Sequence, residues 1–219
     1  MNYLIITKKI WNYKNYKIIK NKNFFVKKKI NSSLIKRIKP RIIFFIHWSN
    51  IIPKNIYEKN LCIQFHSSDL PKFRGGSPIQ NQILKGLKFT KISAFKVNSN
   101  IDKGNICMKS NLKLDGSAIE IYQSMEKTSL KMIKKLIKKK YLDFKPQKGK
   151  GSYFKRRISK DSNIKRNKIK NLEDFYNFIR MLDADNYPRA FLKYKKFNIK
   201  FVNAKKNKKY LSGEYKIEY

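Results

Sequence analysis

The chain contains two histidines, His47 and His66, so acid–base chemistry near neutral pH has few candidates. His66 directly follows an apolar run, 61–65, that is typical of a buried strand. A loop of small and polar residues comes next, then an Arg-Gly-Gly corner at 74–76 and a Ser-Pro pair that could start a helix. Open α/β sheets bind ligands where loops leave the carboxyl ends of their strands. The pattern therefore predicts a ligand site around His66, although a lone histidine at a strand end is more often structural.

The elements that must position this loop are predicted from apolar runs, helix caps and turn residues. Ser117 and Glu120 form a capping box before a long amphipathic pattern, and Asn171 caps a second one. Strands that alternate with helices favour an α/β fold with a largely parallel sheet. Strands are expected at 2–7, 24–26, 41–46, 61–65, 91–97 and 106–114, and helices at 33–38, 78–86, from 117 to about 137, and from 171 until Pro188.

A change of composition divides the chain. The stretch 145–152 is rich in Gly and Lys, which is typical of a linker or an exposed loop. We expect an α/β domain at 1–150 and a C-terminal extension at 151–219. The extension has room for a helix and a short hairpin at 189–201, but not for a full barrel.

The net charge of +39 has two explanations. Clustered basic residues attract nucleic-acid phosphates. However, Lys outnumbers Arg 45 to 8 and is scattered among abundant Ile, Asn, Phe and Tyr. These residue types share AT-rich codons, so genomic base composition explains the pattern at least as well as a polyanionic partner. Either way, positive potential should strengthen salt-sensitive binding of anions.

Composition also indicates the compartment. The chain is 41% hydrophobic, too apolar for a disordered protein. No apolar run approaches the roughly 18 residues of a membrane span, and the N-terminal run is too short for a signal peptide. Cys62 and Cys107 lie in strand-like runs without metal-ligand spacing. We expect a cytoplasmic protein with buried free thiols, no metal site and no membrane partner.

Further short motifs occur in order around the His66 loop. An Asp-x-Gly-x-Ile element begins at Asp102, and a His-Trp-Ser segment at 47–49 precedes Ile52-Pro53. Three later segments, 154–159, 178–182 and 187–191, complete the series. Together these motifs resemble the formyltransferases that use 10-formyltetrahydrofolate, particularly a compact subgroup related to methionyl-tRNA and sugar N-formyltransferases. The similarity covers roughly residues 1–202.

The resemblance implies a Rossmann-like formyltransferase fold and transfer of a formyl group to an amine. Such a reaction needs stabilisation of an oxyanion and a group that collects a proton. By resemblance, His66 handles the proton and Asp102 orients it electrostatically. The family generally has Asn two residues before this histidine, whereas this chain has Gln64. Gln64 shares a strand face with His66, so it is either an oxyanion donor or a buried strand residue.

The resemblance also implies that the loop binds the folate co-substrate or the acceptor. Leu70 and Pro71 would support the folate loop by packing and shape, while Asp69 is either a loop cap or an acceptor contact. Arg74 either contacts an anion or braces the loop. Glycines at the corner would let the backbone approach a ligand. The predicted binding residues are Ser68, Asp69, Leu70, Pro71, Arg74, Gly75 and Gly76.

The acceptor amine is the least constrained part of the prediction. Because only about 30 residues follow Pro188, too few for the five strands of an OB-type barrel, a nucleotide-linked amino sugar is favoured. Methionyl-tRNA is the alternative, with tRNA a possible but not favoured partner. A further alternative is a non-catalytic, basic RNA-binding protein built on a decayed formyltransferase fold, which the charge and Gln64 motivate.

Overall fold

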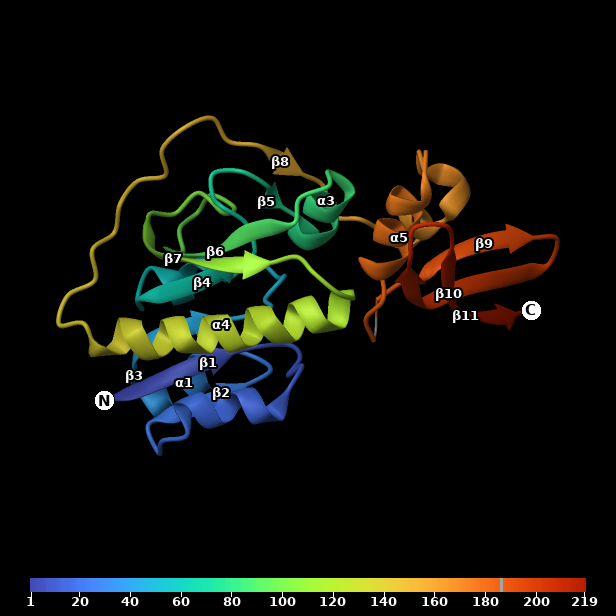
Figure 1. Ribbon diagram of the computed structural model, residues 1–219. Helices are drawn as coiled ribbons and strands as arrows, with labels where there is room; N and C mark the ends of the chain where they lie inside the picture. Colours follow the sequence, from blue (N-terminus) through green and yellow to red (C-terminus); the bar gives the residue numbers. More distant parts are fainter. Residues whose placement is uncertain (186) are drawn as a thin grey trace.

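A six-stranded mixed sheet forms the centre of the computed structural model, which describes residues 1–185 and 187–219. The strands are ordered β2-β1-β3-β4-β6-β7. The first four run parallel, β6 is antiparallel to β4, and β7 is antiparallel to β6 (Figure 1). The carboxyl ends of β1, β3 and β4 therefore meet at one edge of the sheet. The strands are β1 (Asn2–Ile6), β2 (Phe24–Lys27), β3 (Pro40–Phe45), β4 (Cys62–His66), β6 (Phe89–Lys96) and β7 (Ile106–Lys113).

Helices cover both faces of this sheet. On one face the long helix α4 (Ala118–Lys138) lies beside the 3-10 helix η1 (Tyr13–Ile19), and α3 (Pro78–Leu84) joins the same apolar cluster (Figure 1). On the other face lie α1 (Ser32–Ile38) and α2 (Lys54–Tyr57). In the described ranges 1–185 and 187–219, no helix combines the length and the apolar character needed to cross a membrane.

Strand alternation explains why the sheet needs cover on both faces. Ile5 and Phe44 pack in the cluster that includes α4, whereas Ile6 and Phe45 pack in the cluster that includes α1. All four side chains are fully buried. Successive strand residues point to opposite faces, so near-continuous apolar runs are what a parallel sheet covered on both faces requires.

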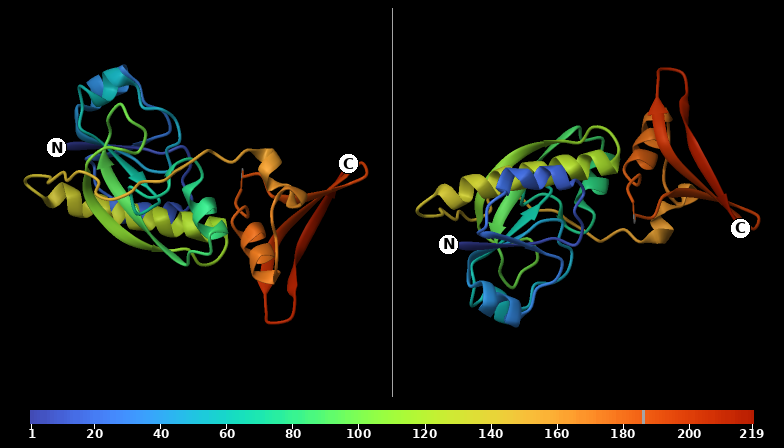
Figure 2. Two further views of the ribbon diagram at one scale, coloured as in Figure 1. Left: turned by 90° about the horizontal axis from the view of Figure 1, so that it is seen from above. Right: turned by 90° about the horizontal axis from the view of Figure 1, so that it is seen from below.

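The C-terminal part begins with a segment, 139–158, that leads from α4 back past the sheet (Figure 1). Within it, β8 (Tyr153–Phe154) pairs in parallel with β5 (Arg74–Gly75). Two 3-10 helices follow, η2 (Ser159–Ser162) and η3 (Ile164–Arg166). Helix α5 (Leu172–Arg180) then packs on an antiparallel sheet of β9 (Ala190–Tyr194), β10 (Phe197–Lys206) and β11 (Leu211–Glu218). Figure 2 shows this sheet to one side of the central sheet.

A buried arginine ties α5 to the rest of the chain. Nη1 of Arg180 donates to the carbonyl oxygens of Leu114 (2.9 Å) and Gly116 (2.8 Å), at the turn before α4. Phe178 and Leu182, neither of them exposed, belong to the same apolar cluster as the central sheet. Part of the C-terminal region therefore shares the core of the central sheet, and a domain boundary at 150/151 stays a prediction.

The mixed α/β fold with a mostly parallel sheet is confirmed. The capping box of Ser117 and Glu120 is present at the start of α4. Several features differ from expectation. The short helix α2 has no counterpart among the expected elements, and α5 ends at Arg180 instead of continuing until Pro188. The 3-10 helix η1 carries no strong sequence pattern. Neither does the β5–β8 pair, because two-residue strands are set by their partners. The expected hairpin at 189–201 is a three-stranded sheet that continues to Glu218.

Candidate functional site

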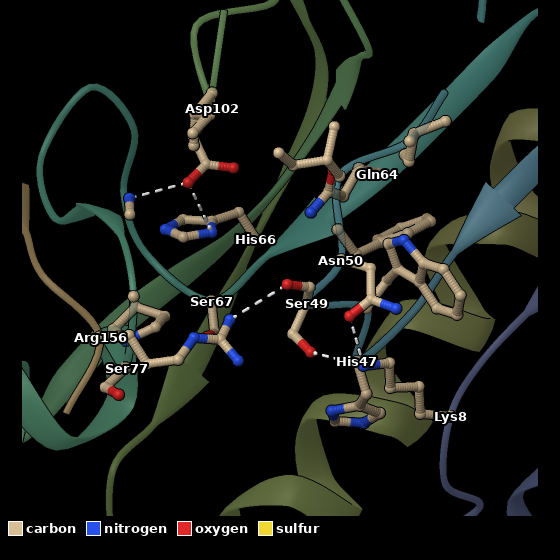
Figure 3. A pocket seen from close by; sticks show the side chains of 18 of the residues that line it. Lys8, His47, Ser49, Asn50, Gln64, His66, Ser67, Ser77, Asp102 and Arg156 are labelled. Atoms are coloured by element: carbon tan, nitrogen blue, oxygen red, sulfur yellow. Dashed lines mark hydrogen bonds and ion pairs between the residues drawn. The ribbon is translucent and has the colours of Figure 1, made fainter. Parts of the chain in front are cut away.

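A cleft of about 1080 Å³ opens where loops leave the carboxyl ends of β1, β3 and β4. Its walls also include the start of α3, the loop between β6 and β7, and the segment around β8 (Figure 3). Ligand pockets of this size bury most of the surface of a small molecule. The topology therefore brings side chains from these six segments to one cavity.

His66 is the last residue of β4, and only 7% of its side chain is exposed. Its Nε2 lies 2.7 Å from the carbonyl oxygen of Phe73. Because a carbonyl can only accept, Nε2 carries the hydrogen of this bond. Nδ1 lies 3.6 Å from Oδ2 of Asp102, which is beyond hydrogen-bond length (Figure 3). A proton taken up at Nδ1 would therefore lie close to the Asp102 carboxylate.

Asp102 is held by the loop that follows His66. Its Oδ2 accepts a hydrogen bond of 2.8 Å from the backbone N–H of Gly75 (Figure 3). Its φ of 53° lies in the left-handed region, which Asp tolerates better than most residues. The carboxylate is 7% exposed. The structure thus brings together His66, at the end of β4, and Asp102, in the loop between β6 and β7.

Gly104 allows the Asp102 loop to fold back onto β6. A Cβ atom at this position would lie 1.7 Å from the carbonyl oxygen of Lys96, a backbone contact that no side chain can avoid. Glycine is therefore required by close approach here, and the Asp-x-Gly spacing has a direct structural cause.

Gln64 and the glycine corner also line the cleft. Gln64 lies two residues before His66 on β4, and the same strand face presents both to the cavity (Figure 3). Gly75 has a φ of 91°, and a Cβ there would lie 2.4 Å from the carbonyl oxygen of Phe154. Glycine therefore permits the tight pairing of β5 with β8, with Gly76 beside it in the cleft wall.

The remaining loop residues lie behind this wall. Of the described residues that line the cavity, none belongs to 68–71. Ser68 donates from Oγ to the carbonyl oxygen of Lys72 (2.6 Å), and its own carbonyl accepts from Ser93 (2.7 Å). Leu70 is buried, and Pro71 follows it through a cis bond. These residues shape the loop that carries the Phe73 carbonyl, and ligand binding by them stays a prediction.

Asp69 anchors the same loop to the sheet. Its carboxylate pairs with Lys91 (3.0 Å) and Lys109. Partial burial acts to raise the pKa of this carboxyl, but hydrogen bonds from the two lysines outweigh it and hold the pKa below its usual value. Of the two interpretations of Asp69, the observed contacts correspond to a loop anchor.

Arg74 braces the loop. Its Nε and Nη2 both donate to Oε1 of Gln147, at 3.1 and 2.6 Å. The guanidinium is thus engaged with the chain, and it does not stand among the described cleft-lining residues. Of its two interpretations, the observed geometry corresponds to the brace.

A basic pair faces the cavity from opposite sides. Nζ of Lys8 donates to Oδ1 of Asn50 (2.5 Å) and Oγ of Ser49 (3.2 Å), while Arg156 reaches the Ser49 carbonyl from the segment around β8 (Figure 3). The composition does not single out Lys8 among so many lysines. Its position two residues after β1 was the one available signal, because ligand sites form beyond the carboxyl ends of parallel strands.

Three aromatic rings form another wall of the cavity. Trp11 stacks on Tyr122 with centroids 4.6 Å apart, and His47 meets both edge-on at 6.1 and 5.8 Å. Glu126, fully buried on α4, accepts from the backbone N–H of Trp11 at 3.0 Å. Burial raises the pKa of Glu126, although its hydrogen bonds oppose the change. These contacts hold the aromatic wall in place, with Tyr122 one turn of α4 before the buried carboxyl group of Glu126.

The other titratable candidates are structural in character. Burial lowers the pKa of His47 to about 3, so this ring is neutral at physiological pH. Cys62 and Cys107 are free thiols, and burial raises their pKa values to about 12 and about 11. Within residues 1–185 and 187–219, no group of three or more His, Cys, Asp or Glu side chains could hold a metal ion.

Sequence comparison decides the family. Residues 6–137, which hold the whole His66–Asp102 arrangement, match the family described as "Formyl transferase". The chain belongs to the formyl transferase family. Residues 159–218 match a second family, described as "Methionyl-tRNA formyltransferase, C-terminal domain". The family suggested by the sequence motifs is thereby confirmed.

Relatives within the family point toward one subgroup. A methionyl-tRNA formyltransferase from Sulfurihydrogenibium is 26% identical over 178 residues, which are 78% of this chain and 56% of that protein. The chain thus spans about half the length of this curated relative. The solved structure of a methionyl-tRNA formyltransferase from Clostridium thermocellum is 40% identical, with a TM-score of 0.90 over 100% of this chain and 99% of that one.

Solved structures named sugar N-formyltransferases are more distant. A sugar N-formyltransferase from Shewanella sp. is 18% identical, with a TM-score of 0.64 over 89% of this chain and 93% of that one. This likeness extends to the fold alone. The expected preference for a sugar acceptor is therefore less well supported than its alternative. The argument from a missing barrel also fails, because a C-terminal domain of the methionyl-tRNA type matches the short region after the linker.

Substitution of Gly104 should be costly. Gly104→Ala places a Cβ against the Lys96 carbonyl, so we expect a loss of about 2–3 kcal/mol in the free energy of unfolding. Gly86→Asn is the matched control, because nothing lies within 4 Å of its Cβ position and Asn tolerates its φ of 73°. Urea denaturation measures both. Equal stability of the two variants would contradict the close approach at Gly104.

The neutral state of His47 should appear in the pH dependence of stability. An unfolded histidine takes up a proton near pH 6.5, whereas folded His47 resists it until about pH 3. His47 therefore contributes no penalty above pH 6.5 and a growing one as the pH falls toward 3. We expect His47→Phe to show a shallower fall of Tm between pH 6.5 and 4 than the unsubstituted chain. Parallel curves would show that His47 titrates normally.

Proposed function

We propose that the chain transfers the formyl group of 10-formyltetrahydrofolate to the amino group of methionyl-tRNA. The observation that carries this proposal is the end-to-end likeness to the Clostridium thermocellum methionyl-tRNA formyltransferase, at 40% identity. The match of residues 159–218 to a methionyl-tRNA formyltransferase C-terminal domain supports the same acceptor. Membership of the formyl transferase family supports the reaction and the folate co-substrate.

The cavity supports a reaction between two bound molecules. Its volume of about 1080 Å³ is large for one small ligand and suits a folate head group beside an acceptor amine. In the reaction a C–N bond forms between the amine and the formyl carbon, and the bond from that carbon to N10 of the folate breaks. The amine loses one proton and N10 gains one. The protein must therefore stabilise a transient oxyanion and move a proton.

His66 and Asp102 have the geometry for the proton step. Nε2 of His66 is committed to the Phe73 carbonyl, so the ring is fixed in orientation and Nδ1 is the nitrogen left to exchange a proton. Asp102, 3.6 Å away, would stabilise the charge of the ring whenever Nδ1 is protonated. The Gly75 N–H keeps the carboxylate in place. A protonated Nδ1 could also donate to the oxyanion and then to N10.

Gln64 is the second proposed donor to the oxyanion. It shares the strand face of His66 and lines the same cavity. An amide N–H aimed at the developing charge contributes more in the transition state than in the ground state. The additional methylene relative to Asn lengthens its reach, while its donor chemistry is the same.

Two features suit a methionyl-tRNA acceptor. The wall of Trp11, His47 and Tyr122 offers aromatic edges and faces, which a thioether side chain contacts favourably. The C-terminal sheet offers lysines for phosphate contacts that depend on salt. Its exposed lysines are Lys193, Lys195, Lys196, Lys205, Lys206, Lys208, Lys209 and Lys216.

Acceptor choice is tested by assaying the chain with 10-formyltetrahydrofolate and each of two acceptors. We expect formylation of charged initiator methionyl-tRNA at a rate at least 100-fold above that of a nucleotide-linked amino sugar. His66→Gln should reduce kcat by about 100-fold or more while the thermal unfolding curve stays unchanged, because general acid–base groups contribute about 10²–10⁴-fold.

Three outcomes would overturn parts of this proposal. Faster formylation of the sugar would replace the acceptor. Absence of turnover with every amine, together with tight salt-dependent RNA binding, would favour a non-catalytic RNA-binding protein. Normal activity of a folded His66→Gln variant would remove His66 from the reaction.

The role of Gln64 is tested by two substitutions of similar size. Gln64→Leu removes the amide and should lower kcat about 100-fold, the usual cost of losing one oxyanion donor. Gln64→Asn restores the residue that the family generally has at this position and should keep kcat within about threefold. Stopped-flow or steady-state kinetics with methionyl-tRNA distinguishes them. Equal kcat for the Leu and Asn variants would show that Gln64 is only a strand residue.

A further inference from the structure

Gln147 uses its entire side-chain amide to connect two loops of the site. Its Oε1 accepts from Nε and Nη2 of Arg74, and its Nε2 donates to the carbonyl oxygens of Asp102 (2.8 Å) and Gly104 (2.9 Å). A carboxamide has two N–H donors and two acceptor positions, and all four are satisfied here. The half-buried side chain lies in the segment between α4 and β8, whose Gly- and Lys-rich composition is typical of a linker.

These bonds close a ring around the Asp102 carboxylate. Gln147 holds the backbone of Asp102, and the N–H of Gly75 holds its side chain. Gly75 directly follows Arg74, whose guanidinium returns to Gln147. Each of these hydrogen bonds restrains one point of the Asp102 loop or of the loop that carries Arg74 and Gly75. Asp102, with its left-handed φ of 53°, is therefore restrained at both ends.

The segment that carries Gln147 is itself fastened to the same loops. Lys145 exchanges two backbone hydrogen bonds with Ile106, at 2.8 and 2.9 Å. Ser152 accepts from the backbone N–H groups of Phe73 and Arg74, both at 2.9 Å. The amide of Gln147 therefore sits on a rigid support, which is what a positioning residue needs.

We infer that Gln147 is a positioning residue that sets the distance between the Asp102 carboxylate and His66. This inference rests on the proposed formyl transfer, in which that distance governs the charge on His66. Only an amide satisfies both sides of the arrangement, because the two carbonyl oxygens require donors and the guanidinium requires an acceptor. A displacement of about 1 Å in a catalytic group is enough to cost about 100-fold in rate.

The test uses two variants that differ in what they remove. Gln147→Leu removes both donor and acceptor, whereas Gln147→Glu keeps the acceptor for Arg74 and places an oxygen against the two carbonyls. We expect both to lower kcat about 10- to 100-fold, with KM for 10-formyltetrahydrofolate and for methionyl-tRNA changed less than threefold. Lys148→Gln, at the exposed neighbouring position, should leave kcat unchanged.

A double-mutant cycle identifies the route of the effect. In an Asp102→Asn background, adding Gln147→Leu or Gln147→Glu should lower kcat less than twofold further, because Gln147 would act through the carboxylate already removed. The same fold-loss in both backgrounds would overturn the inference and leave Gln147 as a general structural residue. If the Leu variant fails to fold, the Glu variant, which retains the pairing with Arg74, decides the question alone.

A spectroscopic readout separates this inference from the proposed function. The chain has two histidines, so the imidazole ¹⁵N spectrum of labelled protein contains only the signals of His47 and His66. Gln147→Leu should shift the His66 signals and their pH dependence while those of His47 stay in place. An enzyme inactive with every acceptor, but with this shift, would refute formyl transfer and retain the positioning role. Unchanged His66 signals would refute the positioning role whatever the activity.

Discussion

The hydrogen bond from the Gly75 N–H to the Asp102 carboxylate is the contact on which the site depends. It joins the loop after β4 to the loop between β6 and β7, and so places a fixed negative charge 3.6 Å from Nδ1 of His66. The two glycines in these loops follow from this contact. Gly75 must accept a φ of 91° where β5 meets β8, and Gly104 must allow the Asp102 loop to touch the backbone of β6. The position of Asp102 beside His66 therefore depends on two close backbone contacts, each of which requires glycine.

Around this contact, charged residues are used mainly to hold loops. Asp69 is shared by two lysines, Arg74 is engaged by Gln147, and Glu126 accepts backbone N–H groups beneath the aromatic wall. Each such bond removes freedom from a cleft segment, which lowers the reorganisation that a bound substrate would otherwise require. The cavity keeps Lys8 and Arg156 as basic groups at its rim, consistent with anionic substrates. Three of the 14 acidic residues in a chain with a net charge of +39, Asp69, Asp102 and Glu126, thus lie at positions that organise the site.

Much of the fold was predictable because its signals are local. Short stretches of consecutive residues carry these signals, namely the apolar runs of the parallel strands, the capping box at Ser117 and the Ser-Pro start of α3. The pair of His66 and Asp102 was also predictable, from spacing that resembles a known family. The extent of the C-terminal sheet was not, because β11 is exposed along most of its length and carries little apolar pattern. That error led to the preference for a sugar acceptor, which the family match of residues 159–218 supports less well than the methionyl-tRNA alternative.

The sequence by itself determined the fold class and the family, and it named the two residues of the proposed catalytic pair. Strand periodicity, helix caps and the order of motifs are properties of consecutive residues, so they can be recognised without knowing any contact in space. The tertiary structure decided what the flanking polar residues do. Asp69 and Arg74 could have faced a ligand, but their partners, Lys109 and Gln147, come from distant segments. Trp11, His47 and Tyr122 form one wall only because a strand end, a loop and α4 meet there. The residue type determines which hydrogen bonds and ion pairs a side chain is able to form, whereas long-range packing determines which partner it actually has.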